Sequence, residues 1–343
     1  MEKQSICVIL EKTPEKGAAS GMEWLFAPME GVTYAVYRKL HREFFPGAAR
    51  YYTPFIAPDS KGGFRAKYLR ELTADREAGL PVIPQLLVNN ADAFNATADV
   101  LHELGFDEIN LNIGCPSGTV FAKRKGSGML SDLSSLDACL DGIYNHAQQK
   151  NYCVSVKTRM GVHSTEEFPE ILEIYNRYPL SGLIVHARAR DGMYKSEPDL
   201  AGFAALSSLA AAPVTYNGNL FSADELNIVL AAAPKTASFM AARGIIANPA
   251  LFRILAGGNA LELSELQGFH DALLEAYLEG GLSPQFTAER MKQLWYYMIW
   301  MFDNCKKEQK ALLKSRTLPE YRSAASALFQ SGKFNPDGKF VQI

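Results

Sequence analysis

The strongest constraint on the fold is a repeating pattern that begins near residue 23. A short apolar run of strand length is followed by a turn and then by an amphipathic segment of helical length. Strands that alternate with helices form parallel β-α units, and eight such units close a (β/α)8 TIM barrel of the α/β class. A doubly wound open sheet is less favoured because no Gly-x-Gly-x-x-Gly follows the first strand. The predicted strands are residues 24–28, 50–52, 82–87, 108–112, 153–157, 182–186, 213–217 and 238–241. The predicted helices between them include residues 34–44, 91–104, 133–148, 166–178, 200–209, 223–232 and 249–256.

The pattern stops at about residue 258, and only helical segments follow it. The predicted helices are residues 263–279, 284–302, 306–316 and 319–329, with Ser264 and Ser283 as expected helix starts. The sequence therefore predicts an N-terminal extension (1–21), a barrel domain (22–258) and a smaller all-helical C-terminal domain (259–343).

Charge and cysteine usage limit the class of protein. A formal net charge of −2 excludes a globally basic nucleic-acid binder but leaves local basic patches open. The five cysteines are scattered without a Cys-x-x-Cys pair, which argues against a disulfide framework or a metal site and favours a reducing, cytoplasmic location. The apolar run at residues 6–10 is too short for a signal peptide, and no run reaches the ~20 residues of a membrane span.

Polar and charged side chains follow almost every predicted strand. The active site of a TIM barrel lies at the carboxyl ends of its strands, so these residues are expected to meet at one mouth. Side chains of this kind at successive strand ends are hard to explain as packing. They are Met29, Glu30, Gln85, Asn112, Cys115, Lys157, Arg159, His186, Arg188, Asn217, Asn219 and Arg243.

Cys115 is the candidate reactive group. It lies in Gly114-Cys115-Pro116, after a predicted strand and before three consecutive cations at residues 123–125. A thiol on a loop rich in positive charge is a candidate for chemistry, whereas a lone cysteine is more often structural. The residues at the other strand ends indicate whether Cys115 is reactive or structural.

The remaining strand-end residues fit a phosphorylated aromatic cofactor. Residues 217–219 and Arg243 follow the last two predicted strands, where barrels often bind a phosphate. Lys157 is suited to offset negative charge on a cofactor ring, and Gln85 both donates to and accepts from a heteroaromatic edge. Together they favour a flavin mononucleotide barrel. A Schiff-base aldolase stays open, because Lys157 alone does not separate the two.

Six segments resemble, in order and spacing, the tRNA-dihydrouridine synthase family. The likeness runs from about Trp24 to the end of the chain. Its most specific part is Asn-x-Gly-Cys-Pro at 112–116, followed by Gly-x-Gly-x-Leu at 126–130. The six segments are residues 27–33, 84–87, 110–116, 156–161, 185–188 and 216–219.

The resemblance implies an FMN-dependent TIM barrel followed by a helical tRNA-binding domain. The implied reaction reduces the C5–C6 double bond of specific uridines in tRNA, with hydride passing from FMN to C6. Cys115, the implied catalytic residue, gives a proton to C5, and NADPH, or alternatively NADH, reduces the flavin. The expected partners are tRNA and NADPH, with no membrane and no metal, and the expected state is a monomer.

The resemblance and the chemistry of the side chains also assign binding roles. The expected cofactor-binding residues are Pro28, Met29, Glu30, Gln85, Lys157, His186, Asn217, Gly218, Asn219, Ala242 and Arg243. The expected substrate-binding residues are Asn112, Arg159, Arg188, Tyr194, Arg290 and Lys292.

The chain departs from the family pattern at two of these positions. Ala242 stands where the family usually has glycine, and Asn219 stands where an acidic residue is common. Two other functions stay open on sequence grounds. One is an FMN-dependent barrel reductase of a small free pyrimidine or enone, which the appended helical domain argues against. The other is a catalytically inactive tRNA-binding factor.

Overall fold

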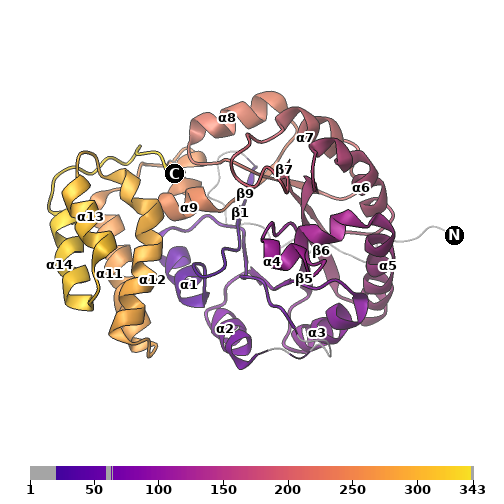
Figure 1. The fold of residues 1–343 in the computed structure, drawn as a ribbon, viewed down its shortest axis with the longest axis horizontal. Coiled ribbons are helices and arrows are strands. Elements are labelled where there is room, and N and C mark those ends of the chain that lie inside the picture. The colour runs from indigo at the N-terminus through magenta and orange to yellow at the C-terminus, as the bar shows by residue number, and fades with distance from the viewer. Residues whose placement is uncertain (1–20, 59–62, 64, 341–343) are drawn as a thin grey trace.

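The structure, a computed structural model, describes residues 21–58, 63 and 65–340. The predicted extension, apart from Gly21, and the apolar run at residues 6–10 lie outside the described residues. Figure 1 looks into a ring of strands surrounded by helices, with the C-terminal helices grouped on one side beside α1 and α9. The predicted (β/α)8 barrel followed by a helical region is confirmed.

All the paired barrel strands are parallel, and they follow one another in the order β3-β2-β1-β9-β8-β7-β6-β5-β4. The strands are β1 (Glu23–Phe26), β2 (Arg50–Tyr52), β3 (Val82–Ile83), β4 (Gln85–Leu86), β5 (Glu108–Ile113), β6 (Cys153–Gly161), β7 (Leu183–Ala189), β8 (Val214–Asn217) and β9 (Ser238–Ala241). Two of the predicted ranges, residues 50–52 and 238–241, match the strands residue for residue.

The third predicted strand is divided in two by Pro84, which has no N–H to donate to a neighbour. Its first half, β3, pairs with β2, and its second half, β4, pairs with β5. The two edges of the sheet are therefore consecutive in the chain, and this closes the barrel. Backbone bonds continue across the seam: Pro84 O accepts from Asn110 N at 2.8 Å, and Gln85 O accepts from Ile56 N at 2.7 Å.

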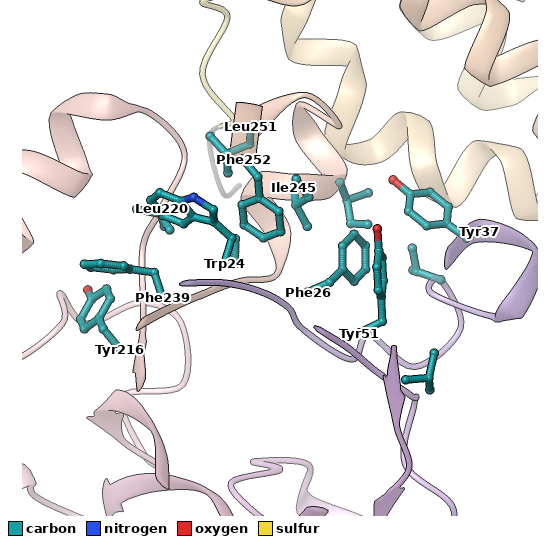
Figure 2. Close-up of a cluster of buried hydrophobic side chains, with 14 of the residues drawn as sticks. Trp24, Phe26, Tyr37, Tyr51, Tyr216, Leu220, Phe239, Ile245, Leu251 and Phe252 are labelled. Carbon is teal, nitrogen blue, oxygen red and sulfur yellow. The ribbon is translucent and has the colours of Figure 1, made fainter. Parts of the chain in front are cut away.

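Side chains alternate between the inside and the outside of the barrel along each strand. A small apolar cluster fills the inside, made of Leu25, Ala27, Tyr52, Ile83, Ile184 and Met240. The larger core lies between the strands and the surrounding helices. Figure 2 shows part of it, with Trp24, Phe26 and Phe239 packed under Ile245, Leu251 and Phe252. The small inner cluster occupies only part of the inside, and the inward positions towards the carboxyl ends of β4 to β8 carry polar side chains.

The helices around the barrel mostly follow the expected positions. They are α1 (Ala35–Phe44), α2 (Ala66–Glu77), α3 (Ala91–Glu103), α4 (Gly118–Phe121), η1 (Gly126–Ser131), α5 (Leu133–Lys150), η2 (Thr165–Glu167), α6 (Phe168–Tyr175), α7 (Leu200–Ser207), α8 (Ala223–Ala232), α9 (Arg243–Ala247) and α10 (Leu251–Leu255). The prediction did not include α2, α4, η1 or α9. Three of these are short, and α2 carries only two buried residues, Leu72 and Asp75.

The C-terminal region consists of α11 (Leu263–Glu279), α12 (Pro284–Met298), η3 (Ile299–Met301), α13 (Lys306–Lys314) and α14 (Leu318–Phe329). Ser283 caps α12 as predicted, because its side chain accepts from Phe286 N. The predicted start at Ser264 is wrong: Glu262 and Glu265 form a capping box at this end of α11. Phe269 of α11 packs against Phe45 and Tyr37 of the barrel, with ring centroids 5.3 and 5.5 Å apart.

Residues 333–340, here called the C-terminal strap, run back from α14 towards the barrel. Asn335 N donates to Met301 O at 2.7 Å, and Phe334 forms an antiparallel bridge with Phe302. At the end of the strap the Phe340 ring lies 5.3 Å from the Tyr297 ring and 5.8 Å from the Phe221 ring. The strap thus connects the helical region to the loop after β8.

Among the described cysteines, Cys115, Cys139 and Cys305 are free, whereas Cys153 is disulfide-bonded. The scattered cysteine spacing did not anticipate that bond. Within the part of the chain that the structure describes, no helix is both long enough and apolar enough to cross a lipid bilayer.

Candidate active site

The alternation of side chains brings the predicted strand-end residues together inside the barrel. The register of strand pairing sets their heights along the barrel axis. Asn112 pairs with Lys157, Arg159 with His186, and His186 with Asn217. These residues come from four neighbouring strands, β5 to β8. Lys157 and Asn217 also touch each other across the intervening β7. The predicted clustering at the carboxyl ends of the strands is therefore what the fold produces.

Cys115 lies on a tight turn directly after β5. Asn112 Oδ1 accepts from Gly114 N at 3.0 Å and from Cys115 N at 2.9 Å, and this fixes the backbone of the turn. Ser127 Oγ donates to Cys115 O at 2.7 Å from the other side. Gly126, which precedes Ser127, has a φ of 56°, in the left-handed region that favours glycine. Because the turn is held from both sides, the thiol has a defined, half-buried position.

Burial raises the pKa of the Cys115 thiol above its ordinary value. The Ser117 N–H and the charges of Lys157 and Arg159 only partly offset that effect. The sulfur therefore carries its proton at neutral pH. A protonated thiol is suited to give up a proton, and it is a weak nucleophile.

Lys157 projects from β6 into the barrel and is half-buried among polar groups. Its Nζ donates to Asn217 Oδ1 at 2.9 Å. Burial lowers the pKa of Lys157 to about 7, and repulsion from Arg159 is the next cause. Within the described residues this ammonium forms no ion pair with a carboxylate. An anionic ligand would stabilise its charged form.

Arg188 links the ends of β7 and β8. Its Nη1 lies 3.0 Å from His186 Nε2, and its Nη2 donates to Asn219 Oδ1 at 3.0 Å. An arginine only donates, so His186 Nε2 must be the acceptor and the ring proton must reside on Nδ1. Burial and the surrounding cations, Arg159 first, lower the pKa of His186 well below its ordinary value. His186 is thus a neutral donor through Nδ1.

Arg159 lies under Tyr194 at the mouth. Its Nε donates to Gly114 O at 3.0 Å, and its Nη1 donates to the carbonyls of Ala189 and Met193, both at 3.0 Å. Its Nη2 is buried and makes no hydrogen bond within the described residues. An unpaired buried donor is costly. The nitrogen is therefore available to a ligand.

Arg243 and Asn219 form the end of the site next to β9. Arg243 Nη2 donates to Asn219 Oδ1 at 3.1 Å, and its guanidinium lies 4.7 Å from the centre of the Tyr194 ring. Ala242 has a φ of −115°, which any residue adopts, so the backbone at this position does not require the glycine usual in the family. Gly244, in contrast, cannot carry a side chain without a shift of the backbone, since an added Cβ would lie 1.9 Å from Leu220 O.

The other expected cofactor residues lie around this set. Pro28 and Met29 are half-buried after β1, and Glu30 is exposed. Gln85 is buried, and its amide is held at both ends: Nε2 donates to Asn110 Oδ1 at 2.8 Å, and Oε1 accepts from Asn112 Nδ2 at 2.7 Å. Asn112, expected to bind substrate, directs its amide to Gln85 and to the backbone of the Cys115 turn.

The two residues expected to meet RNA from the helical region have different surroundings. The Arg290 guanidinium lies 4.3 Å from the centre of the Tyr34 ring, at the junction with the barrel. Lys292 Nζ donates to Ser315 O and to Glu289 Oε1, both at 2.7 Å, and its side chain is only 12% exposed. Lys292 therefore holds α12 against the segment after α13.

Asn110 and Ser155 were not among the predicted site residues, and they extend the polar contacts of Gln85 deeper into the barrel. Asn110 Nδ2 donates to Ser155 Oγ at 2.9 Å. The signal that would have found them is the strand period of two, because Asn110 precedes Asn112, and Ser155 precedes Lys157, by two residues. Both are polar side chains at inward positions of buried strands.

The fold and the site define a (β/α)8-barrel enzyme whose reactive groups gather at the carboxyl ends of the strands. The chain belongs to the dihydrouridine synthase family, whose model, described as "Dihydrouridine synthase (Dus)", matches residues 25–317. It is accordingly an oxidoreductase.

Similar proteins agree with this membership. A tRNA-dihydrouridine(16) synthase from Pseudomonas putida is 28% identical over 289 residues, covering 81% of this chain and 88% of that protein. The tRNA-dihydrouridine synthase B of Pasteurella multocida is 26% identical over 230 residues, or 67% of each chain. Among solved structures, 6-hydroxypseudooxynicotine amine oxidase from Pseudomonas geniculata is similar with a TM-score of 0.50 and 12% identity, over 68% of this chain and 47% of that chain. That likeness concerns the fold alone.

Proposed function

We propose that this protein is an FMN-dependent tRNA-dihydrouridine synthase that uses NADPH to reduce the flavin and Cys115 to protonate the uracil. The observation that carries the proposal is a group of basic side chains, the half-buried Lys157 and the buried Arg159 and Arg188, around the half-buried Cys115 thiol at the barrel mouth. Family membership and the names of the relatives support the reaction, and the geometry of the site supports the choice of residues. The domain division at residues 258 and 259 is part of the same proposal.

The residues present fit FMN. Lys157, Arg159 and Arg188 form no ion pair with a carboxylate within the described residues, and the buried Arg159 Nη2 donor has no hydrogen-bond partner among them. Residues 217–219 with Ala242 and Arg243 would hold the phosphate, where backbone N–H groups and a guanidinium meet. Pro28, Met29 and Glu30 would line the flavin. Lys157, Gln85 and His186 would face its ring, Lys157 and His186 as donors.

When bound and reduced, FMN supplies a hydride to C6 of the uracil. The negative charge that develops on the uracil carbonyls needs donors, and Arg159 Nη2 and Arg188 are the available cationic ones. Cys115 holds a proton at neutral pH and gives it to C5. The Asn112 and Ser127 contacts hold the thiol in place, so proton transfer requires little rearrangement of the loop.

The substrate must present a single uridine to a recessed site. A uridine leaves its stack to enter such a site, and cationic surroundings stabilise the RNA backbone beside it. Lys123 and Arg124 are exposed near the mouth, next to the Cys115 loop. Tyr194 is 39% exposed and offers a face to the nucleotide. Arg290 is the expected contact from the helical region.

Two measurements test the proposal. Purified protein, reconstituted with FMN if necessary, should show flavin absorbance, which a Schiff-base enzyme would lack. A deletion strain should lose dihydrouridine at defined tRNA positions and regain it when the wild-type gene is restored. Equal turnover of free uridine nucleosides without tRNA would instead support a small-molecule reductase. A colourless protein that cannot be reconstituted would refute the flavin assignment.

A further inference from the structure

Four polar side chains form one continuous hydrogen-bonded chain inside the barrel, below the mouth. From the deep end, Ser155 Oγ accepts from Asn110 Nδ2 at 2.9 Å, and Asn110 Oδ1 accepts from Gln85 Nε2 at 2.8 Å. Gln85 Oε1 accepts from Asn112 Nδ2 at 2.7 Å. Asn112 Oδ1 then accepts from the backbone of Cys115 at 2.9 Å. The chain thus runs from a buried serine to the catalytic turn.

The donor and the acceptor of every bond in this chain can be assigned by starting from its upper end. A backbone N–H only donates, so the Asn112 atom facing Cys115 N must be the oxygen, and its nitrogen must face Gln85. The oxygen of Gln85 is then towards Asn112 and its nitrogen towards Asn110. By the same reasoning the nitrogen of Asn110 faces Ser155. No amide in the chain can flip alone without opposing two donors or two acceptors.

This fixed direction matters most at Gln85. An amide nitrogen carries two hydrogens and an amide oxygen two lone pairs, and the chain uses one of each. Gln85 therefore offers one donor and one acceptor in a set orientation. Asn110 and Ser155 are 0% and 1% exposed. They pair with each other two residues before the Asn112–Lys157 pair, which places them deeper in the barrel on the same inward-facing side of β5 and β6.

We propose that Asn110 and Ser155 are positioning residues, which fix the orientation of the Gln85 amide and, through Asn112, hold the turn that carries Cys115. The inference rests on the proposed function in giving Cys115 and Gln85 their roles. It adds two residues that act without touching cofactor or substrate. Their effect passes along the four hydrogen bonds named above, three of which separate Asn110 from Cys115.

The polarity of the chain separates this role from simple filling of the core. At this fully buried position the carboxyl of Asn110→Asp keeps its proton, so it accepts from Gln85 and donates to Ser155 Oγ, and the direction is preserved. Asn110→Leu has similar volume but leaves Gln85 without its acceptor. Ser155→Thr keeps a hydroxyl at the deep end, whereas Ser155→Ala removes it. These are two matched pairs that differ mainly in hydrogen bonding.

The first experiment measures alkylation of Cys115 by iodoacetamide against pH, followed by peptide mass spectrometry, in protein free of flavin and tRNA. When the turn loosens, the thiol becomes more accessible and its pKa falls towards the ordinary value. Asn110→Leu should therefore react about fivefold faster than wild type near neutral pH, the effect of about one lost hydrogen bond. Asn110→Asp should stay within about twofold of wild type.

The second experiment records the absorption spectrum of FMN bound to the same variants. A shifted flavin maximum is expected in Asn110→Leu and Ser155→Ala but not in their matched partners. If Asn110→Leu does not fold, the serine pair decides both measurements. Unchanged alkylation and spectra in folded Asn110→Leu or Ser155→Ala would overturn the inference, as would equal changes within a matched pair. The alkylation needs neither flavin nor tRNA, so its failure is distinct from failure of the proposed function.

Discussion

Cys115 combines a fixed position with a proton that it keeps at neutral pH. The position comes from contacts with Asn112 and Ser127, and the protonation comes from burial, which raises the thiol pKa. A thiol in this state acts as a general acid rather than as a nucleophile. This assignment makes Cys115 the most informative single residue to change.

Cys115→Ala is expected to lower the rate of dihydrouridine formation by about 10²–10⁴-fold, the usual contribution of a general acid. FMN binding and stability should change little, because the side chain is small and half-buried. Turnover of purified tRNA under single-turnover conditions measures the rate. Cys139→Ala, which removes a buried thiol from α5, is the control and should retain activity. Full activity of Cys115→Ala would contradict the proton-donor role.

Lys157 predicts a pH dependence of stability in the cofactor-free protein. Its pKa is about 7 in the folded protein, against an ordinary value of 10.5. Between these values the unfolded chain binds more protons, so the free energy of unfolding rises with pH. Below pH 7 the penalty for the buried charge is fully present. Lys157→Met should therefore raise the free energy of unfolding, most at about pH 7 and below and very little near pH 10.5.

Urea unfolding of Lys157→Met and wild type across this pH range measures the difference. Comparing the two proteins cancels the titration of the groups they share. Lys39→Met is a suitable control, because the Lys39 side chain is 56% exposed and its removal should give no such trend. A constant difference between Lys157→Met and wild type at all pH values would show that the buried charge does not cause the effect.

Much of the site was predictable residue by residue, because the strand period and the barrel rule place strand-end side chains together. The sequence could not indicate that Asn112 would turn inward to hold Cys115, since an asparagine makes such a bond as readily as it contacts a ligand. Nor could it indicate that Lys292 would be enclosed by Glu289 and Ser315. Both outcomes depend on which residues the fold places opposite them.

At the scale of elements, the strands were predicted best and α2 was missed. Strands such as β2 and β9 are short apolar runs bounded by turns, so their local signal matches their burial. Helix α2 (Ala66–Glu77) has no apolar stripe, and of its residues only Leu72 and Asp75 are buried. It is anchored by an ion pair, in which Asp75 binds Arg38 of α1. That partner lies 37 positions away in the sequence, and no local pattern reveals it.

The Arg38–Asp75 pair gives a stability prediction for this element. Both side chains are completely buried. Asp75→Ala leaves Arg38 buried with only the more distant Glu71 to balance its charge, and should lower the free energy of unfolding by about 3–5 kcal/mol. The double variant Arg38→Met with Asp75→Leu should lose much less, because no buried charge remains. Chemical denaturation of the three proteins measures the difference, and a larger loss in the double variant would contradict it.

At the scale of the whole molecule, the barrel and the helical region share one buried core. Phe269 of α11 packs on Phe44, Phe45 and Tyr37 of α1 and the segment that follows it. The C-terminal strap adds a second connection through Phe340. The predicted boundary at residue 258 therefore separates two patterns of secondary structure, while the apolar packing runs across it.

This shared core predicts a single cooperative unfolding transition. Trp24 reports on the barrel and Trp295 on the helical region, and both are buried. Urea unfolding followed in Trp24→Phe and in Trp295→Phe, each with Trp300 also changed to Phe, should give coincident midpoints. Phe269→Ala should lower both midpoints together, with a loss of about 3–5 kcal/mol. Midpoints that separate would mean that the two regions unfold independently.

The protonated state of Cys115 also bears on how the enzyme withstands oxidants. Peroxides attack thiolates far faster than thiols, and most cysteine enzymes expose a thiolate in order to work. In the proposed mechanism the sulfur acts through the proton that it retains, so its chemistry and its resistance to oxidation would have the same origin. We expect an enzyme that works in this way to keep its general acid reduced under stress that would inactivate a cysteine nucleophile.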